Sequence, residues 1–208
     1  MTAAPLRPAV TRDRIAEAAL SLLDDASDEG ALTMRSLAAR LGVQAPSLYA
    51  HVSGMDEIHE LVHSRINAAI DVSVVWESDD LADLAELGRR YRAAYRAHPI
   101  AASIIITRSV NRDHALRVYE AIADFLLRFG VPADQVMPIM AVFDTLVLGS
   151  AVEPFSAGFT GELVDYRHRY PGLARALGSV DRRGIDDAGF EIGLASFLDL
   201  VRSLATSA

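Results

Sequence analysis

The sequence predicts an all-α protein, and three observations support this fold class. Apolar residues recur three and four residues apart in several segments, most clearly in 113–129. Nowhere do they alternate with polar residues as they do in a half-buried β-strand. With 208 residues, of which 51% are hydrophobic and 23% charged, the chain is long enough to bury a core and too apolar to be disordered.

The N-terminal part of the chain is expected to hold three short helices after a mobile arm. The arm, residues 1–11, is rich in Pro and Ala, and its Arg7 is either free to reach a phosphate or incidental to a disordered tail. A first helix is predicted over 12–26, where one apolar stripe runs along the segment. Acidic residues then lead into a loop at Gly30.

The segment 33–52 has the pattern of a helix-turn-helix. Thr33 stands where an N-cap is needed, and apolar residues follow it at helical spacing. Gly42 can adopt the left-handed conformation that ends a helix, and Pro46 is tolerated in the first turn of the next one. In a helix-turn-helix, the second helix enters the major groove of DNA.

Charge and side-chain chemistry in this segment suit nucleic acid. The segment 33–53 has two Arg, one His and no acidic residue, although the chain carries a net charge of −8. Leu48 and Val52 would anchor the second helix, while polar side chains on it are suited to base edges and phosphates. The alternative is an ordinary helical hairpin, because Gly between two helices is common and short motifs give false positives.

A second motif lies in the next predicted helix, 56–71. The run from His59 to His63 reads HELVH, which fits the HExxH pattern of zinc peptidases. The two histidines would share a helix face and could hold Zn²⁺, with Glu60 activating water. No third ligand or substrate-cleft pattern follows, so chance occurrence is the better interpretation. A zinc hydrolase using His59, Glu60 and His63 remains only as an alternative.

The rest of the chain predicts further helices. Residues 154–161 form a break, and 162–189 is a polar segment with little periodicity. The helix 133–153 is apolar nearly all round, so it should be buried against its own core and against another subunit. The predicted helices after residue 71 are 81–98, 100–107, 113–129, 133–153 and 190–204.

Bulk features suggest a cytoplasmic protein. The N-terminus has Pro5 and Pro8 and lacks the apolar stretch of a signal peptide. The most apolar run, 136–152, contains Pro138 and Asp144 and is short for a membrane span. There is no Cys, which excludes disulfides and thiolate metal sites. We find no catalytic constellation and expect no cofactor.

The segment 12–62 resembles the N-terminal domain of TetR-family transcriptional repressors along its whole length. The marks that carry the resemblance are the opening helix, Thr33, the LAARLGV run at 37–43, the PSLY run at 46–49 and the HV pair at 51–52. The resemblance implies a non-enzymatic all-α homodimer. It implies a DNA-binding domain at 10–70 and a ligand-binding and dimerisation domain at 71–208.

Position by position, the resemblance implies a set of DNA-contacting residues. Arg35 matches a base-reading position, and Tyr49 and His51 match phosphate-contacting positions. Met55 departs from the family, which usually has Lys there, so one phosphate contact should be lost and the salt dependence should flatten by about one unit. The DNA-binding residues implied are Thr33, Arg35, Gln44, Ala45, Pro46, Ser47, Tyr49 and His51.

The resemblance also implies dimerisation and an effector. Members pair through two helices per subunit, here 133–153 and 190–204, and the two-fold pair reads a palindromic operator. A small molecule of unknown identity would fill a cavity in the C-terminal domain and release the DNA. Asp144 is the sharpest candidate contact, because a carboxylate in so apolar a helix needs a partner. The ligand-binding candidates are Trp76, Tyr95, Tyr119, Phe125, Met140, Phe143, Asp144 and Phe155.

Two other functions stay open at this point. One is a TetR-like protein that binds DNA constitutively or acts as an activator, without an inducer. The other is a helical enzyme or adaptor whose N-terminal segment resembles a DNA-binding domain without binding DNA. Binding to the DNA upstream of its own coding sequence would separate the second of these from a regulator, and a screen for molecules that release that DNA would separate the first from a ligand-responsive repressor.

Overall fold

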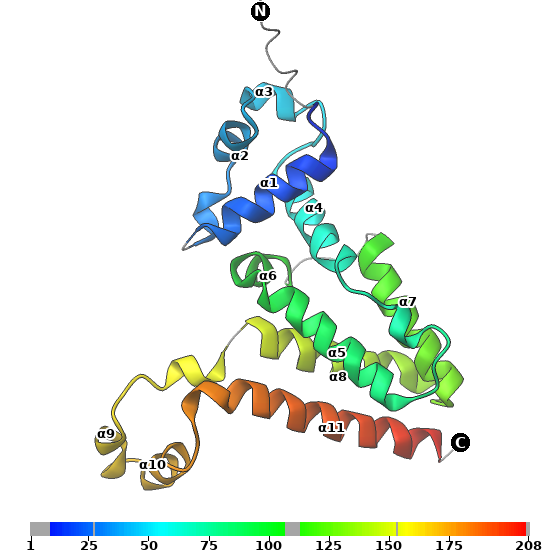
Figure 1. Ribbon diagram of the computed structural model, residues 1–208, viewed down its shortest axis with the longest axis vertical. Helices are drawn as coiled ribbons and strands as arrows, with labels where there is room; N and C mark the ends of the chain where they lie inside the picture. Colours follow the sequence, from blue (N-terminus) through cyan, green and yellow to red (C-terminus); the bar gives the residue numbers. More distant parts are fainter. Residues whose placement is uncertain (1–8, 27, 107–112, 153, 207–208) are drawn as a thin grey trace, which may run out of the picture. The chain divides into compact units, whose positions relative to one another are not determined.

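The computed structural model of the chain describes residues 9–26, 28–106, 113–152 and 154–206 (Figure 1). Within these ranges it contains α- and 3-10 helices and no strand, which confirms the predicted all-α fold. Arg7, Thr107 and Glu153, which belong to the predicted arm and to two predicted helices, lie outside the described residues.

The described helices follow one another in this order. They are α1 (Arg12–Asp24), η1 (Glu29–Ala31), α2 (Met34–Leu41), α3 (Ala45–Leu48), α4 (Met55–Ala68), η2 (Ser73–Val75), α5 (Leu81–Arg96), α6 (Pro99–Ile105), α7 (Asp113–Phe129), α8 (Ala133–Val152), η3 (Phe155–Gly158), α9 (Leu163–Arg167), α10 (Pro171–Leu177), η4 (Arg182–Gly184) and α11 (Ile185–Ala205).

The chain forms two compact units. The first, called the N-terminal unit, comprises Met1–Ile70 and Ala97–Val118; the second unit comprises Asp71–Arg96 and Tyr119–Ala208. The N-terminal unit therefore includes α6, which follows α5 in sequence, and α7 begins in one unit and ends in the other. A functional division at residue 70, into a DNA-binding part and a ligand-binding part, stays a prediction.

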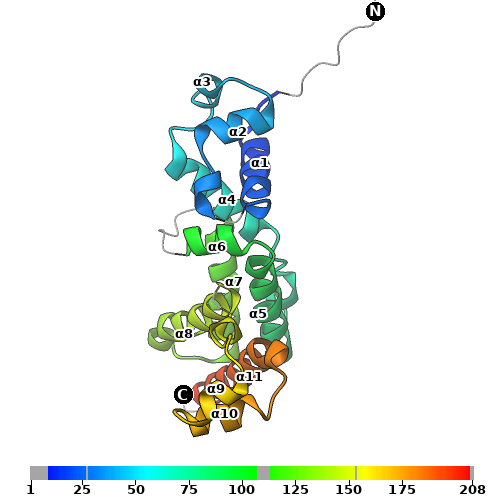
Figure 2. The ribbon, with the colours of Figure 1, turned by 90° about the vertical axis from the view of Figure 1, so that its left-hand side faces the viewer.

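In the N-terminal unit, α1 packs against α2 and α4, and α6 packs against α1 and α4 (Figure 2). Apolar side chains at helical spacing on α1 and α4 supply most of the buried surface, as the stripe at 12–26 predicted. A hydrogen bond of 2.8 Å between His98 Nδ1 and Asp24 Oδ1 joins the residue before α6 to the end of α1. The fully buried core residues of this unit are Ile15, Ala19, Leu37, Leu48, Ile58, Val62 and Ala102.

In the second unit, α8 packs against both α5 and α11. Glycines allow close approach at two points: a Cβ on Gly88 would lie 3.2 Å from the ring of Phe143, and a Cβ on Gly193 would lie 2.6 Å from Leu146. The rings of Phe143 and Phe197 are 5.0 Å apart, so α8 and α11 share an aromatic contact. This layer of three helices forms the core of the unit.

The segment 162–189 differs from its prediction, because it contains α9, α10 and η4, and α11 begins at Ile185 rather than at 190. These short helices are started by local signals rather than by periodic apolar residues. Glu162 and Asp165 form a reciprocal capping pair at the start of α9, and Pro171 occupies the first position of α10. A search for apolar stripes could not find helices of five and seven residues.

Helix α8 is long and apolar enough to cross a membrane by length and composition, and only 33% of its most apolar window is buried. The helix is longer than the run 136–152 that was judged short for a membrane span, and its predicted burial against another subunit is not tested within one chain. Its buried face, which includes Val136, Phe143 and Val147, packs in the second unit. On the other face, Met137 is 68% exposed and Val142 also lies open. Within one chain, α8 therefore keeps an apolar face without a partner.

Candidate nucleic-acid interface and effector site

The helix-turn-helix is built by local hydrogen bonds that the sequence signalled. The Thr33 hydroxyl accepts a hydrogen bond of 3.0 Å from the backbone N–H of Ser36, and the Ser36 hydroxyl accepts one of 2.9 Å from the backbone N–H of Thr33. Gly42 ends α2 with φ of 69°, in the left-handed region expected of it. Helix α3 is a single turn, continued by hydrogen bonds of 2.9 and 3.0 Å from the N–H groups of His51 and Val52 to the carbonyl of Leu48.

Buried residues and one carboxylate hold α3 in place. Leu48 and Val52 are both buried, as their spacing predicted. After α3, Glu57 accepts hydrogen bonds from the backbone N–H of Ser53 at 2.7 Å and from its hydroxyl at 2.9 Å, and Glu57 also pairs with Arg12 at the start of α1. The Glu57 side chain on α4 therefore connects Ser53, which follows the helix-turn-helix, to α1. Sequence reasoning missed this role of Glu57; the available signal was an acidic residue at the third position of a helix, from which a carboxylate can accept from N–H groups before the helix.

The predicted DNA-contacting residues lie mainly at the surface. Thr33, Arg35, Gln44, Pro46, Ser47 and Tyr49 are exposed, and Ala45 and His51 are half-buried. Tyr49 is 59% exposed, which is unusual for so large an aromatic side chain. Within the described part of the chain, no hydrogen bond or ion pair engages the side chains of Arg35, Gln44, Ser47, Tyr49 or His51.

Arg40 lies on the same helix as Arg35, but its side chain is engaged in contacts within the fold. Its guanidinium donates to the Ser21 hydroxyl and to the Asp25 carboxylate, both at 2.7 Å, so it serves to join α2 to α1. Arg35 makes no such contact in the described residues and keeps all its N–H donors available. The two arginines of the segment therefore differ in availability, and only Arg35 has a free fork for a guanine or a phosphate.

The HELVH run lies in the middle of α4. Among the residues that the structure describes, no three His, Cys, Asp or Glu side chains gather closely enough to hold a metal ion. Histidines four residues apart share a helix face, and two ligands on one face do not make a zinc site without a third.

Asp144 finds its partners in two tyrosines of the second unit. The Tyr91 hydroxyl donates to Asp144 Oδ1 at 2.9 Å, and the Tyr119 hydroxyl donates to the same oxygen at 3.0 Å. Burial raises the pKa of Tyr91 well above its usual value, and burial together with the Asp144 charge raises the pKa of Tyr119 to about 12. Both phenols therefore stay protonated as donors. No cation pairs with Asp144 within the described residues, so the carboxylate keeps Oδ2 as an open acceptor.

The other ligand-binding candidates divide into two groups. Tyr95, Phe125, Met140 and Phe143 are buried, and the Tyr95 ring lies 5.3 Å from that of Tyr91. Trp76, which follows η2, and Phe155, the first residue of η3, are instead 54% and 67% exposed. Phe155 lines an apolar pocket of about 460 Å³ between α8 and α11. Tyr91, which sequence reasoning missed, joins Tyr119 and Asp144; its place four residues before Tyr95 on one helix face was the available signal.

Several known proteins are similar to this chain in sequence. Residues 77–203 match the family described as tetracyclin repressor-like, C-terminal domain. The chain is 30% identical over 193 residues to the tetracycline repressor protein class A from transposon 1721 of Escherichia coli, covering 89% of this chain and 87% of that protein. It is 33% identical over 148 residues to an HTH-type transcriptional regulator of Saccharopolyspora erythraea, covering 69% of this chain and 61% of the regulator.

The structural comparison extends over nearly the whole chain. The TetR family protein ActR of Streptomyces coelicolor, solved in complex with actinorhodin, has a TM-score of 0.75 at 26% identity, with 93% of this chain and 99% of that chain covered. The protein is therefore an all-helical regulator with an N-terminal helix-turn-helix.

The chain belongs to the TetR family of transcriptional regulators. This is a family of DNA-binding proteins and not of enzymes, so the alternative of a zinc hydrolase at His59, Glu60 and His63 is wrong. The chain spans 61% of the length of the Saccharopolyspora regulator that it matches.

Proposed function

We propose that this protein is a dimeric, ligand-responsive repressor that acts in the cytoplasm and binds a palindromic operator through residues 33–52. The observation that carries the proposal is the set of outward polar side chains on α2 and α3 without partners in the described chain. A polar group that is exposed and unbonded loses little when it exchanges water for a base edge or a phosphate. Arg35 reads a base, Gln44 to Ser47 enter the major groove, and Tyr49 and His51 contact phosphates.

The partner surface proposed for a second copy is the outer face of α8 and α11. On α8, exposed Met137, Ala141, Thr145 and Gly149 follow at helical spacing. On α11, exposed Gly189, Ile192, Ser196 and Leu200 do the same. The two helices pack side by side, and the apolar pocket at Phe155 lies between them. Two copies joined through these faces form a four-helix bundle that removes the apolar surface of α8 from water.

A dimer also follows from what DNA reading requires. One turn of recognition helix contacts only a few base pairs, which cannot select one site in a genome. Two-fold symmetry doubles the contact and matches a palindrome with half-sites about one helical turn apart.

The effector site proposed lies around Asp144 in the second unit. The open Oδ2 of Asp144 is a polar handle, and the neighbouring rings of Tyr91, Tyr95 and Tyr119 supply an aromatic surface. The relative ActR was solved with actinorhodin, which supports a small organic molecule as the effector class. Phe125, Met140 and Phe143 are proposed as apolar lining, and Trp76 and Phe155 as contacts from η2 and η3.

Substituting Arg35 tests the DNA-reading part of the proposal. Removal of one bidentate base contact costs about 1 to 3 kcal/mol, so Arg35→Ala should weaken operator binding by about 5- to 150-fold. The measurement is fluorescence anisotropy of the full chain on DNA upstream of its own coding sequence, at fixed salt. Arg175→Gln, an exposed arginine on α10 in the second unit, is the matched control and should bind as the unchanged protein does. Equal affinities for all three proteins would contradict the assignment.

Substituting Asp144 tests the effector part. We expect Asp144→Asn to keep operator affinity and to weaken release by any molecule that a screen finds to release the unchanged protein. The amide oxygen can still accept from both tyrosines, so the helix packing survives, while the negative charge is lost. Unchanged release by every active compound would remove Asp144 from the site. A screen without any releasing molecule would favour the second candidate function, a constitutive DNA-binding regulator.

A further inference from the structure

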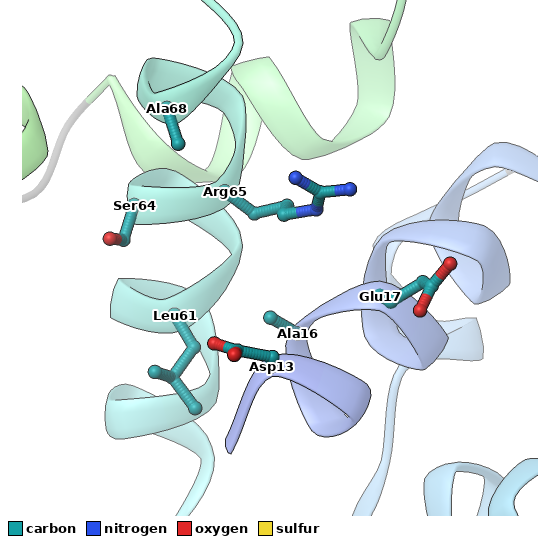
Figure 3. Close-up of a pocket in the computed structure, with 7 residues that line it drawn as sticks. All are labelled: Asp13, Ala16, Glu17, Leu61, Ser64, Arg65 and Ala68. Atoms are coloured by element: carbon teal, nitrogen blue, oxygen red, sulfur yellow. The ribbon is translucent and has the colours of Figure 1, made fainter. Parts of the chain in front are cut away.

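A pocket separate from the proposed effector site lies wholly inside the N-terminal unit, between α1 and α4. It has a volume of about 390 Å³ (Figure 3). Asp13, Ala16 and Glu17 share one face of α1 at spacings of three and four residues. Its other wall is formed by Leu61, Ser64, Arg65 and Ala68, which share one face of α4 in the same way.

Small side chains explain why a space remains between two packed helices. Ala16 is buried at the floor of the pocket, and Ala68 lines it from α4, so neither wall fills the gap. Figure 3 shows Arg65 extending from α4 toward α1 and Asp13 extending from α1 toward α4. The walls are therefore charged and the floor is apolar.

The three charged residues of the pocket are not used by the fold. Within the described residues, no hydrogen bond or ion pair engages the side chains of Asp13, Glu17 or Arg65. Their neighbours behave differently, since Arg12 pairs with Glu57 and Arg40 pairs with Asp25. Ligand pockets use a small number of convergent polar groups to orient the ligand, and these three side chains are available for that role.

The arrangement of charge restricts what can bind. Two carboxylates stand on the α1 wall and one guanidinium stands on the α4 wall, so an ion of a single sign meets repulsion from one wall. A molecule with an ammonium group at one end and a carboxylate at the other satisfies both walls. The Arg65 fork suits a carboxylate, and Asp13 and Glu17 suit an ammonium group.

We propose that this pocket, in the N-terminal unit, is a second small-molecule site. It binds a small zwitterion of the ω-amino acid class. The bound molecule contacts both α1 and α4, the two helices that the Arg12–Glu57 ion pair also joins. The site shares no residue with the Asp144 cluster, so the proposal does not depend on the effector site or on DNA binding.

The test is calorimetric titration of the full-length protein with γ-aminobutyrate and ε-aminocaproate, up to about 20 mM, beyond the millimolar range expected for so small a ligand. Butylamine and butyrate, which carry one charge each, are the control ligands. We expect binding of at least one ω-amino acid and binding about tenfold weaker or absent for both single-charge controls. Equal binding of the amine or of the acid would overturn the proposal, and so would the absence of binding by both zwitterions.

Variants then place the binding in the pocket. Arg65→Gln, and separately the double variant Asp13→Asn with Glu17→Gln, should each weaken the zwitterion by about tenfold or more, because each removes one charged partner. Arg175→Gln, which lies in the second unit, should leave its binding unchanged. Thermal unfolding of each variant, followed by circular dichroism, checks that α1 and α4 remain folded. Full binding in folded Arg65→Gln would show that the zwitterion binds elsewhere and would overturn the assignment.

Discussion

Replacing Phe143 by Ala should lower the free energy of unfolding of the protein by about 3 to 5 kcal/mol. Phe143 is 1% exposed, packs its ring against Gly88 of α5, and lies 5.0 Å from the ring of Phe197 on α11. Its removal leaves a cavity at the point where three helices meet, and glycine on α5 offers no side chain to fill it. Urea unfolding followed by circular dichroism, at one fixed protein concentration, measures the loss.

A substitution at an exposed position controls for this effect. Val180→Ala changes an exposed residue between α10 and η4, outside the proposed dimer interface, and should alter stability by less than about 0.5 kcal/mol. If Phe143→Ala cost no more than Val180→Ala, the layer of α5, α8 and α11 would not be the core of the second unit.

Placing a charge on the outer face of α11 should convert the dimer to monomers. Ile192 is 69% exposed within one chain, and a carboxylate there would be buried without a partner in the proposed four-helix bundle. An uncompensated buried charge costs about 3 to 5 kcal/mol, and two-fold symmetry applies the cost twice. We therefore expect Ile192→Glu to be monomeric by sedimentation at micromolar concentration and to lose measurable affinity for the palindromic operator.

The matched control is Leu127→Glu, which puts the same charge on an exposed leucine of α7, outside the proposed interface. This variant should sediment as the unchanged protein does. A dimeric Ile192→Glu protein, or an unchanged protein that is itself monomeric, would contradict the proposed bundle.

Features of this fold that depend on local chemistry could be predicted from the sequence. The helix cap at Thr33, the left-handed turn at Gly42 and the spacing of Leu48 and Val52 involve neighbouring residues only. They could therefore be recognised without knowledge of the tertiary structure. The long helix α7 has enough residues for an apolar period to show, and α8 is recognised instead because it is apolar over most of its length. Short α9 and α10 do not, and their caps were overlooked.

Features that depend on distant parts of the chain could not be predicted in the same way. Asp144 was recognised as a carboxylate that needs a partner, but its partners Tyr91 and Tyr119 are 53 and 25 residues away. Leu116 and Leu127 fit the apolar stripe of α7, yet both are about half exposed, because a stripe does not say how wide a face its neighbours cover. The Arg12–Glu57 and Arg40–Asp25 pairs join different helices, and no spacing rule describes such contacts.

In and beside the helix-turn-helix, some polar side chains stabilise the fold and others point to solvent. Thr33, Ser36, Arg40 and Glu57 make the structural bonds, whereas the polar groups of Gln44, Ser47 and Tyr49 make none in the described chain. Substitutions at positions 44 and 47 can therefore change which DNA sequence the protein prefers, with little loss of stability. A library randomised at those two positions should yield many well-folded proteins with new operators, whereas randomising 36 and 57 should lower the thermal stability of most members.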